Sequence, residues 1–280
     1  MESLVTTDWL AKELGASDLR VVDATKFMGG SERNARAEYE AGHIPSAVFM
    51  DLADLVDPGN SIENMAPKAE KFASRMQSLG LGDGSRIVLY DDSPLASASR
   101  AWWLLKLFGA HDVALLDGGL AKWKAEGRAL EMGNHTLRHR HFTVWHDAKA
   151  VRTKAQILAN IASNAEQVVD ARGAARFTGE DRDPRPGMAP GHIPGSRNLP
   201  MCDLFNADGT WKQGDALLAA FAAAGIDTVK PMIATCGSGM TASAVTFAAH
   251  LLGNDDVALY DGSWAEWGAD PATPKATGAS

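Results

Sequence analysis

One cysteine lies in a loop that could make its thiol reactive. Between an apolar run and a helical pattern the chain reads Cys236-Gly237-Ser238-Gly239-Met240-Thr241. Glycines let such a loop curl, so that successive backbone N–H groups face the cysteine sulfur. Those donors and the start of the following helix favour a thiolate, lowering a cysteine pKa from about 8.5 to between about 3.5 and 7.5. The loop therefore predicts a nucleophile at Cys236 that needs neither a metal nor a histidine base.

Three other interpretations of this loop are possible. A buried cysteine acting as a small apolar side chain is the commoner role of the residue. The pattern Gly237-x-Gly239-x-x-Ala242 fits a dinucleotide-binding loop, but it comes late in its domain and not on the first strand. A phosphate-transferring loop would place an arginine where Ala242 stands, to clamp phosphate in a bidentate pair. Glycines beside a cysteine at a strand end favour the nucleophile.

The elements that must position this loop alternate between short β-branched runs and longer helical patterns. Buried strands are expected at 20–23, 86–90, 113–116, 167–170, 231–235 and 257–260. Helices are expected at 67–79, 97–108, 215–224 and 241–251. This alternation predicts an α/β fold in which a mainly parallel sheet has helices on both faces. Ligands bind such sheets beyond the carboxyl ends of the strands, where the loop lies.

Three motifs recur in the same order in the two halves of the chain. Val21-Val22-Asp23-Ala24 returns as Val168-Val169-Asp170-Ala171, and Gly42-His43-Ile44-Pro45 returns as Gly191-His192-Ile193-Pro194. The third motif, Asp117-Gly118-Gly119-Leu120-Ala121-Lys122-Trp123, returns as Asp261-Gly262-Ser263-Trp264-Ala265-Glu266-Trp267. A spacing of about 144–149 residues is that of a whole domain. We therefore expect two tandem domains, 1–137 and 151–280, with a linker at 138–150.

The region around this linker is rich in histidine. His135, His139, His141 and His146 lie between residues 127 and 149 and show little apolar periodicity. They lack the spacing of a zinc site and have no cysteine or carboxylate cluster beside them. We expect an exposed linker there, and no metal site in the chain.

Composition narrows the possible partners and compartments. The chain has 280 residues, 45% of them hydrophobic, and a net charge of −8, which argues against nucleic acid or an anionic membrane as the main partner. No stretch approaches the ~18 apolar residues of a membrane span. Cys202 and Cys236 cannot form a disulfide framework, and no signal peptide is visible, so we expect a cytoplasmic protein.

Taken together, the motifs resemble those of the tandem-domain rhodanese family of sulfurtransferases. The resemblance covers about residues 9–268 and rests on the repeated Gly-His-Ile-Pro, Arg100-Ala101-Trp102-Trp103, Asp117-Gly118-Gly119, the loop 236–241 and Tyr260-Asp261-Gly262-Ser263-Trp264. It implies that Cys236 attacks the sulfur of a donor, holds it as a persulfide and passes it to a thiol or cyanide acceptor. No cofactor is implied, and a thioredoxin-like reductant is a further implied partner.

The resemblance also assigns donor-binding groups. Arg176 and Arg185 match arginines of the family's substrate-binding segment, and Arg182 lies between them without a family match. Forked cations suit a donor with a carboxylate and a ketone, although a surface ion pair with Glu180, Asp181 or Asp183 is the alternative for each arginine. Ser238 is expected to hydrogen-bond the departing enolate or relay its proton. The backbone N–H groups expected to hold the persulfide charge are those of Gly237, Gly239, Met240 and Thr241.

The loop 236–241 also bears on the choice of donor. It resembles the Cys-Gly-Ser-Gly-x-Thr loop of family members that use 3-mercaptopyruvate and release pyruvate, whereas thiosulfate-using relatives carry basic residues there. The family often has a histidine where this chain has Asn64, acting with an aspartate like Asp51 and the loop serine. An amide can orient a hydroxyl but cannot take its proton, so we expect no such relay.

The repeat gives an internal comparison. Aligning the halves puts Asp91 where Cys236 stands, and a carboxylate cannot hold a transferable sulfur, so the first domain is expected to be a non-catalytic partner. His43 and His192 occur in both halves, which favours a structural turn for each. Two alternatives to a 3-mercaptopyruvate enzyme stay open: a thiosulfate:cyanide sulfurtransferase, and a non-catalytic rhodanese-like module that binds a protein partner.

Overall fold

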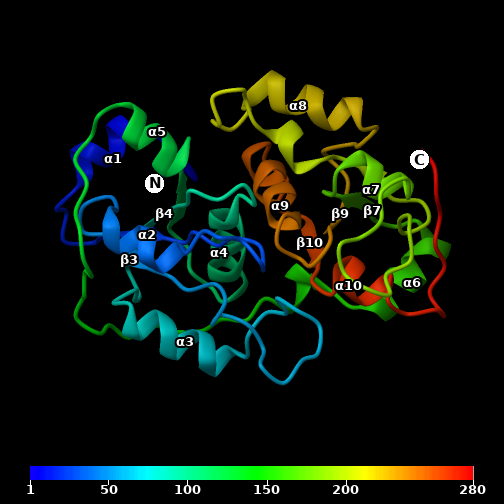
Figure 1. Ribbon diagram of the computed structural model, residues 1–280, viewed down its shortest axis with the longest axis horizontal. Coiled ribbons are helices and arrows are strands. Elements are labelled where there is room, and N and C mark those ends of the chain that lie inside the picture. Colours follow the sequence, from blue (N-terminus) through cyan, green and yellow to red (C-terminus); the bar gives the residue numbers. More distant parts are fainter. Residues whose placement is uncertain (280) are drawn as a thin grey trace. The chain divides into compact units, whose positions relative to one another are not determined.

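The computed structural model describes residues 1–279, which form two compact units. Unit 1 consists of Met1–Asp57, Ala66–Asp147 and Ala207–Trp211. Unit 2 consists of Pro58–Met65, Ala148–Asn206 and the chain from Lys212 onward. Each unit contains a five-stranded parallel sheet with helices packed on it (Figure 1). The predicted α/β fold with two tandem domains is confirmed, while the boundaries 137 and 151 stay predictions.

The sheet of unit 1 has the strand order β1-β5-β4-β2-β3. Its strands are β1 (Leu4–Val5), β2 (Leu19–Asp23), β3 (Val48–Phe49), β4 (Arg86–Tyr90) and β5 (Val113–Leu116). Its helices are α1 (Thr7–Glu13), α2 (Ala35–Ala41), α3 (Ala69–Ser78), α4 (Ser97–Leu107) and α5 (Gly119–Ala125). All five positions of β2 are buried, as expected for a parallel strand covered on both faces.

The sheet of unit 2 repeats this topology in the order β6-β10-β9-β7-β8. Its strands are β6 (Val151–Arg152), β7 (Gln167–Asp170), β8 (Arg197–Asn198), β9 (Met232–Thr235) and β10 (Val257–Tyr260). Its helices are α6 (Lys154–Ser163), α7 (Ala174–Thr178), α8 (Gly214–Ala223), α9 (Ala242–Leu251) and α10 (Ser263–Trp267), with 3-10 turns at Ala148–Ala150 and Met201–Leu204. The central strand β9 is therefore the counterpart of β4, and the loop after each occupies the same place in its fold.

The connector is mostly exposed, as predicted, but it also packs on unit 1. Arg140 Cβ would lie 2.5 Å from a Cβ built on Gly82, and Trp145 Cβ would lie 2.7 Å from one built on Gly109. The amide of Trp145 donates to the carbonyl of Phe108 at 3.1 Å. Because glycines let its backbone approach this closely, the segment up to Asp147 packs on unit 1, although most of its side chains are exposed.

The helices of residues 1–279 are too short or too polar to cross a bilayer.

Candidate active site

Cys236 lies at the carboxyl end of β9, the central strand of unit 2. Its side chain is 2% exposed, and its carbonyl accepts a hydrogen bond from the amide of Trp264, at 3.0 Å. The neighbouring carbonyl of Gly237 accepts the amide of Ala265, at 2.8 Å. These two bonds fix the start of the loop to α10, which follows the adjacent strand β10. The strand end expected to carry a reactive group therefore holds a well-anchored thiol.

The hydroxyl of Ser263 ties two points of this loop together. Its Oγ accepts the amides of Cys236 at 3.2 Å and Gly239 at 3.1 Å, and donates to the carbonyl of Tyr260 at 2.8 Å. Ser263 is fully buried and has a φ of 48°, in the left-handed region that costs a non-glycine residue roughly 1–2 kcal/mol. Sequence reasoning did not single out this residue.

The contact with Ser263 corrects the expectation that the amide of Gly239 holds the persulfide charge. It leaves the same expectation open for the other loop amides. Because the Gly239 amide donates to Ser263, it is not directed at an anion as expected. Within residues 1–279, by contrast, no acceptor takes a hydrogen bond from the amides of Gly237, Ser238, Met240 and Thr241. These four loop amides, two on each side of Gly239, form a set of hydrogen-bond donors that an anion on this loop could use.

The carboxylate of Asp183 pairs with both of the arginines that are predicted to bind the sulfur donor. Arg185 makes a bidentate pair with its carboxylate, with Nε to Oδ1 at 2.8 Å and Nη2 to Oδ2 at 2.9 Å. Arg176 Nη2 reaches the same Oδ2 at 2.6 Å. Burial alone would raise the pKa of Asp183, but the hydrogen bonds from Arg185 and Arg176 hold this pKa well below its usual range. The ion-pair alternative is thus realised for both arginines through Asp183, but the side chain of Asp183 is buried and does not lie at the surface as expected.

The arginine pair also adjoins the cysteine loop. Arg185 Nη1 donates to the carbonyl of Gly237 at 2.7 Å. A Cβ built on Gly237 would lie 3.1 Å from Arg176 Nη2 and 3.3 Å from Arg185 Nη2, so the absence of a side chain there lets both guanidinium groups approach the loop. Arg176 Nε is buried and has no partner within residues 1–279. Arg182, in contrast, is exposed.

The segment Pro58–Met65 supplies two further contacts within unit 2. Asn64 Nδ2 donates to Ser238 Oγ at 3.0 Å, and Glu63 Oε1 accepts from Arg185 Nη1 at 3.0 Å. Asn64 therefore contacts the loop serine, as the resemblance implies for the histidine that the family often has at this position. Its amide donates a hydrogen bond to the serine and cannot take the serine proton. Since the serine oxygen accepts this bond, its own proton is free for another acceptor.

Asp91 shows how the corresponding loop of unit 1 differs. Its backbone carbonyl accepts the amide of Leu120 at 3.0 Å, just as Cys236 accepts that of Trp264. Its carboxylate accepts the amides of Ala98 and Ser93, and burial raises the pKa of this carboxyl group to about 7. Gly119 stands in the place of Ser263, with a φ of 54°. Amides that follow β4 in unit 1 are thus bonded to the carboxylate of Asp91, consistent with a non-catalytic domain.

The repeated histidines and strand-end aspartates have structural contacts. Nδ1 of His43 lies 2.8 Å from the carbonyl of Tyr39, and Nδ1 of His192 lies 2.8 Å from that of Phe177. Asp170 pairs with Arg172, whose Nη2 lies 2.7 Å from Oδ2. The same contact in both copies supports the structural role expected for the two histidines.

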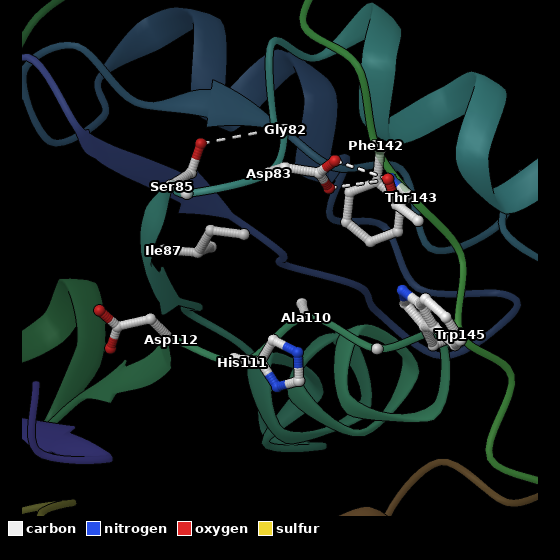
Figure 2. Close-up of a pocket in the computed structure, with 12 residues that line it drawn as sticks. Gly82, Asp83, Ser85, Ile87, Ala110, His111, Asp112, Phe142, Thr143 and Trp145 are labelled. Atoms are coloured by element: carbon white, nitrogen blue, oxygen red, sulfur yellow. Dashed lines mark hydrogen bonds between the residues drawn. The ribbon is translucent and has the colours of Figure 1, made fainter.

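Among the described residues, a cavity and a second cysteine lie outside this site. In the described part of the chain, no group of three or more His, Cys, Asp or Glu side chains could hold a metal ion. A cavity of about 370 Å³ lies in unit 1, between the strand ends near Ser85 and Ile87 and the connector residues Phe142 and Trp145 (Figure 2). It is lined by none of the residues around Cys236, and Cys202 is exposed and lies outside the loop.

Comparison with known proteins agrees with the observed fold. Residues 6–126 and 153–270 each match the rhodanese-like domain family. The chain is 41% identical over 271 residues to 3-mercaptopyruvate sulfurtransferase of Escherichia coli K12, covering 96% of both chains, and 39% identical to the human 3-mercaptopyruvate sulfurtransferase, covering 95% of this chain and 91% of that one. The crystal structure of SseA from E. coli, described as a 3-mercaptopyruvate sulfotransferase with a rhodanese fold, matches with a TM-score of 0.86 and 38% identity, covering 94% of this chain and 99% of that one.

The chain therefore belongs to the rhodanese family, with two rhodanese-like domains in tandem. Within that family it is a sulfurtransferase, as its full-length relatives are.

Proposed function

We propose that the protein moves sulfur from 3-mercaptopyruvate to a thiol or cyanide acceptor through a persulfide on Cys236. The Cys236 thiolate attacks the donor's sulfur, the carbon–sulfur bond breaks, and its electron pair stays on carbon as the enolate of pyruvate. A proton then adds to that carbon, and the second sulfur stays on Cys236. Thiolate or cyanide attacks the outer sulfur, taking it as a persulfide or thiocyanate and restoring the Cys236 thiolate.

The observation that carries this proposal is the placement of two guanidinium groups against Gly237, the residue next to the nucleophile. A donor whose reactive sulfur meets Cys236 brings its carboxylate and ketone to this side of the loop, where cations with several N–H donors suit both groups. The buried, unpartnered Nε of Arg176 supports the binding of the sulfur donor by these two arginines. A buried N–H group without a hydrogen-bond acceptor costs about 1–3 kcal/mol until it is bonded.

Ser238 and the loop amides stabilise negative charge on different atoms during the reaction. The amides of Gly237, Ser238, Met240 and Thr241 stabilise the anion on sulfur. Ser238, with its oxygen already accepting from Asn64, has its proton free to donate to the enolate oxygen. The loop 237–241 itself contains no charged side chain, which favours the carboxylated donor over the doubly charged thiosulfate.

The donor assignment is tested by steady-state rates with both donors and cyanide as acceptor. We expect a kcat/KM for 3-mercaptopyruvate at least about tenfold above that for thiosulfate, a difference of about 1.4 kcal/mol in transition-state binding. A larger kcat/KM for thiosulfate would make the protein a thiosulfate:cyanide sulfurtransferase. No turnover with either donor would favour the non-catalytic protein-binding module.

The proposal also covers the sulfur acceptor and the cellular location of the protein. A thioredoxin-like dithiol would take the outer sulfur as hydrogen sulfide while forming its own disulfide, and its effect on the rate with 3-mercaptopyruvate tests this. A cytoplasmic location, expected from the scarcity of cysteine, is tested by cell fractionation.

A further inference from the structure

Arg185 has little hydrogen-bonding capacity left for a ligand. Of its five N–H groups, Nε and one on Nη2 bind Asp183, and the two on Nη1 serve Glu63 and the Gly237 carbonyl. One N–H on Nη2 remains. A forked contact with a donor carboxylate needs two adjacent N–H groups, so one of the existing acceptors must leave first.

The three acceptors differ in how easily they can be released. The side chain of Asp183 is 2% exposed and bound to two arginines, so its removal would leave charges buried without a partner. The Gly237 carbonyl belongs to the backbone of the anchored loop. The side chain of Glu63 is 55% exposed and can turn into water at little cost. Glu63 is therefore the acceptor that a ligand of Arg185 displaces.

Glu63 is held near this position by its own segment. The next residue, Asn64, has a φ of 62°, and its side chain is bonded to Ser238. This turn directs two successive side chains to different partners, Glu63 to the arginine and Asn64 to the loop serine. Both of these partners act on the donor in the function proposed above.

We propose that Glu63 is a specificity-determining residue, a resident carboxylate that occupies Arg185 and that the carboxylate of the sulfur donor displaces. This inference rests on the proposed function, in which Arg185 binds that carboxylate. Glu63 then lowers the affinity for 3-mercaptopyruvate without taking part in sulfur transfer, and it leaves Arg185 paired when no donor is bound. The binding of any carboxylated ligand at Arg185, including the product pyruvate, is weakened in the same way.

The test is Glu63→Gln, which keeps the shape of the side chain and removes its charge. We expect KM for 3-mercaptopyruvate and the inhibition constant of pyruvate to fall about two- to fivefold, the range that an exposed ion pair supports, with kcat unchanged. Glu180→Gln removes the same charge from an exposed residue nearby and should leave KM unchanged. In an Arg185→Ala background, Glu63→Gln should have no further effect on KM.

The outcomes separate this inference from the proposed function. If the wild-type protein takes no sulfur from 3-mercaptopyruvate, the proposed function fails. If it does, an unchanged or raised KM in Glu63→Gln overturns the inference while that function stands. An equal fall in Glu180→Gln, or an undiminished effect without Arg185, also overturns it, because the cause would then be general charge.

Discussion

The hydroxyl oxygen of Ser263 accepts the backbone amide of Cys236 at 3.2 Å. The same oxygen accepts the amide of Gly239, so one buried side chain fixes the turn from which the remaining loop amides project. Unit 1 keeps the neighbouring backbone bond from Leu120 to Asp91 but has Gly119 in place of this serine. The hydroxyl is thus present in the copy that carries the thiol and absent from the copy that does not.

Replacing Ser263 tests whether this contact positions the nucleophile. Ser263→Gly suits a φ of 48° and matches the residue in unit 1, but it removes the acceptor of two amides. We expect the rate of Cys236 alkylation by iodoacetamide at neutral pH to fall about tenfold, because losing the partner of a buried amide costs about 1–3 kcal/mol. Ser196→Ala removes an equally buried hydroxyl of unit 2, bonded to Ile193, and serves as the control. Alkylation as fast as in the wild-type protein would show that Ser263 only fills space.

Arg176 and Arg185 are expected to act on the carboxylate of the donor. Arg185→Ala or Arg176→Ala should raise KM for 3-mercaptopyruvate by about tenfold or more, since a charge-assisted hydrogen bond contributes about 1.5–3 kcal/mol. KM for thiosulfate should rise less. Arg182→Ala, in the same segment but exposed, should leave both values near those of the wild-type protein. Equal increases for the two donors would contradict the carboxylate assignment.

Asn64 is expected to matter only where a carbon leaving group must be protonated. Asn64→Gly is compatible with a φ of 62° and removes the amide that donates to Ser238. Freed of this bond, the serine hydroxyl is less well oriented, so kcat with 3-mercaptopyruvate should fall several-fold, about the effect of one neutral hydrogen bond of 0.5–1.5 kcal/mol. The rate with thiosulfate, which forms no enolate, should change little. A similar loss with both donors would mean that Asn64 merely holds the loop.

Asp91 gives unit 1 a pH-dependent stability. Burial raises the pKa of this carboxyl group to about 7 in the folded protein, above an unfolded value of about 3.9. The folded state therefore binds the proton more tightly, and the free energy of unfolding should decrease as pH rises from about 4 to about 7 and then level off. Asp91→Asn should reduce this slope, measured by urea unfolding at each pH. Burial also raises the pKa of Asp23, so some slope should remain. An identical slope in Asp91→Asn would contradict the assignment.

Much of the fold could be predicted from sequence because its central strands are buried and its halves repeat. The ranges 86–90, 113–116, 167–170 and 257–260 coincide with β4, β5, β7 and β10. The edge strands β1, β3, β6 and β8 were missed, since two residues are too short to show periodicity. The packing of the connector on unit 1 was not predicted, because it depends on glycines far away in sequence, such as Gly82.

The site was predicted less completely than the fold. The cysteine loop is local in sequence, and the structure brings Arg176, Arg185 and Ser238 together with it. Asp183 was considered only as a surface partner of the arginines, whereas its burial follows from tertiary packing. Ser263 carried a usable sign, since it replaces a glycine in an otherwise repeated motif. Glu63 carried no comparable sign, because its contact with Arg185 joins distant parts of the chain.

The central claim is that Cys236 itself carries the transferred sulfur. The direct measurement is intact-protein mass spectrometry after exposure to 3-mercaptopyruvate without an acceptor, on the wild-type protein, Cys236→Ser and Cys202→Ser. We predict that the wild-type protein and Cys202→Ser gain the mass of one sulfur atom, which cyanide removes, and that Cys236→Ser gains none. A gain that persists in Cys236→Ser, or no gain in the wild-type protein while pyruvate is released, would contradict the account.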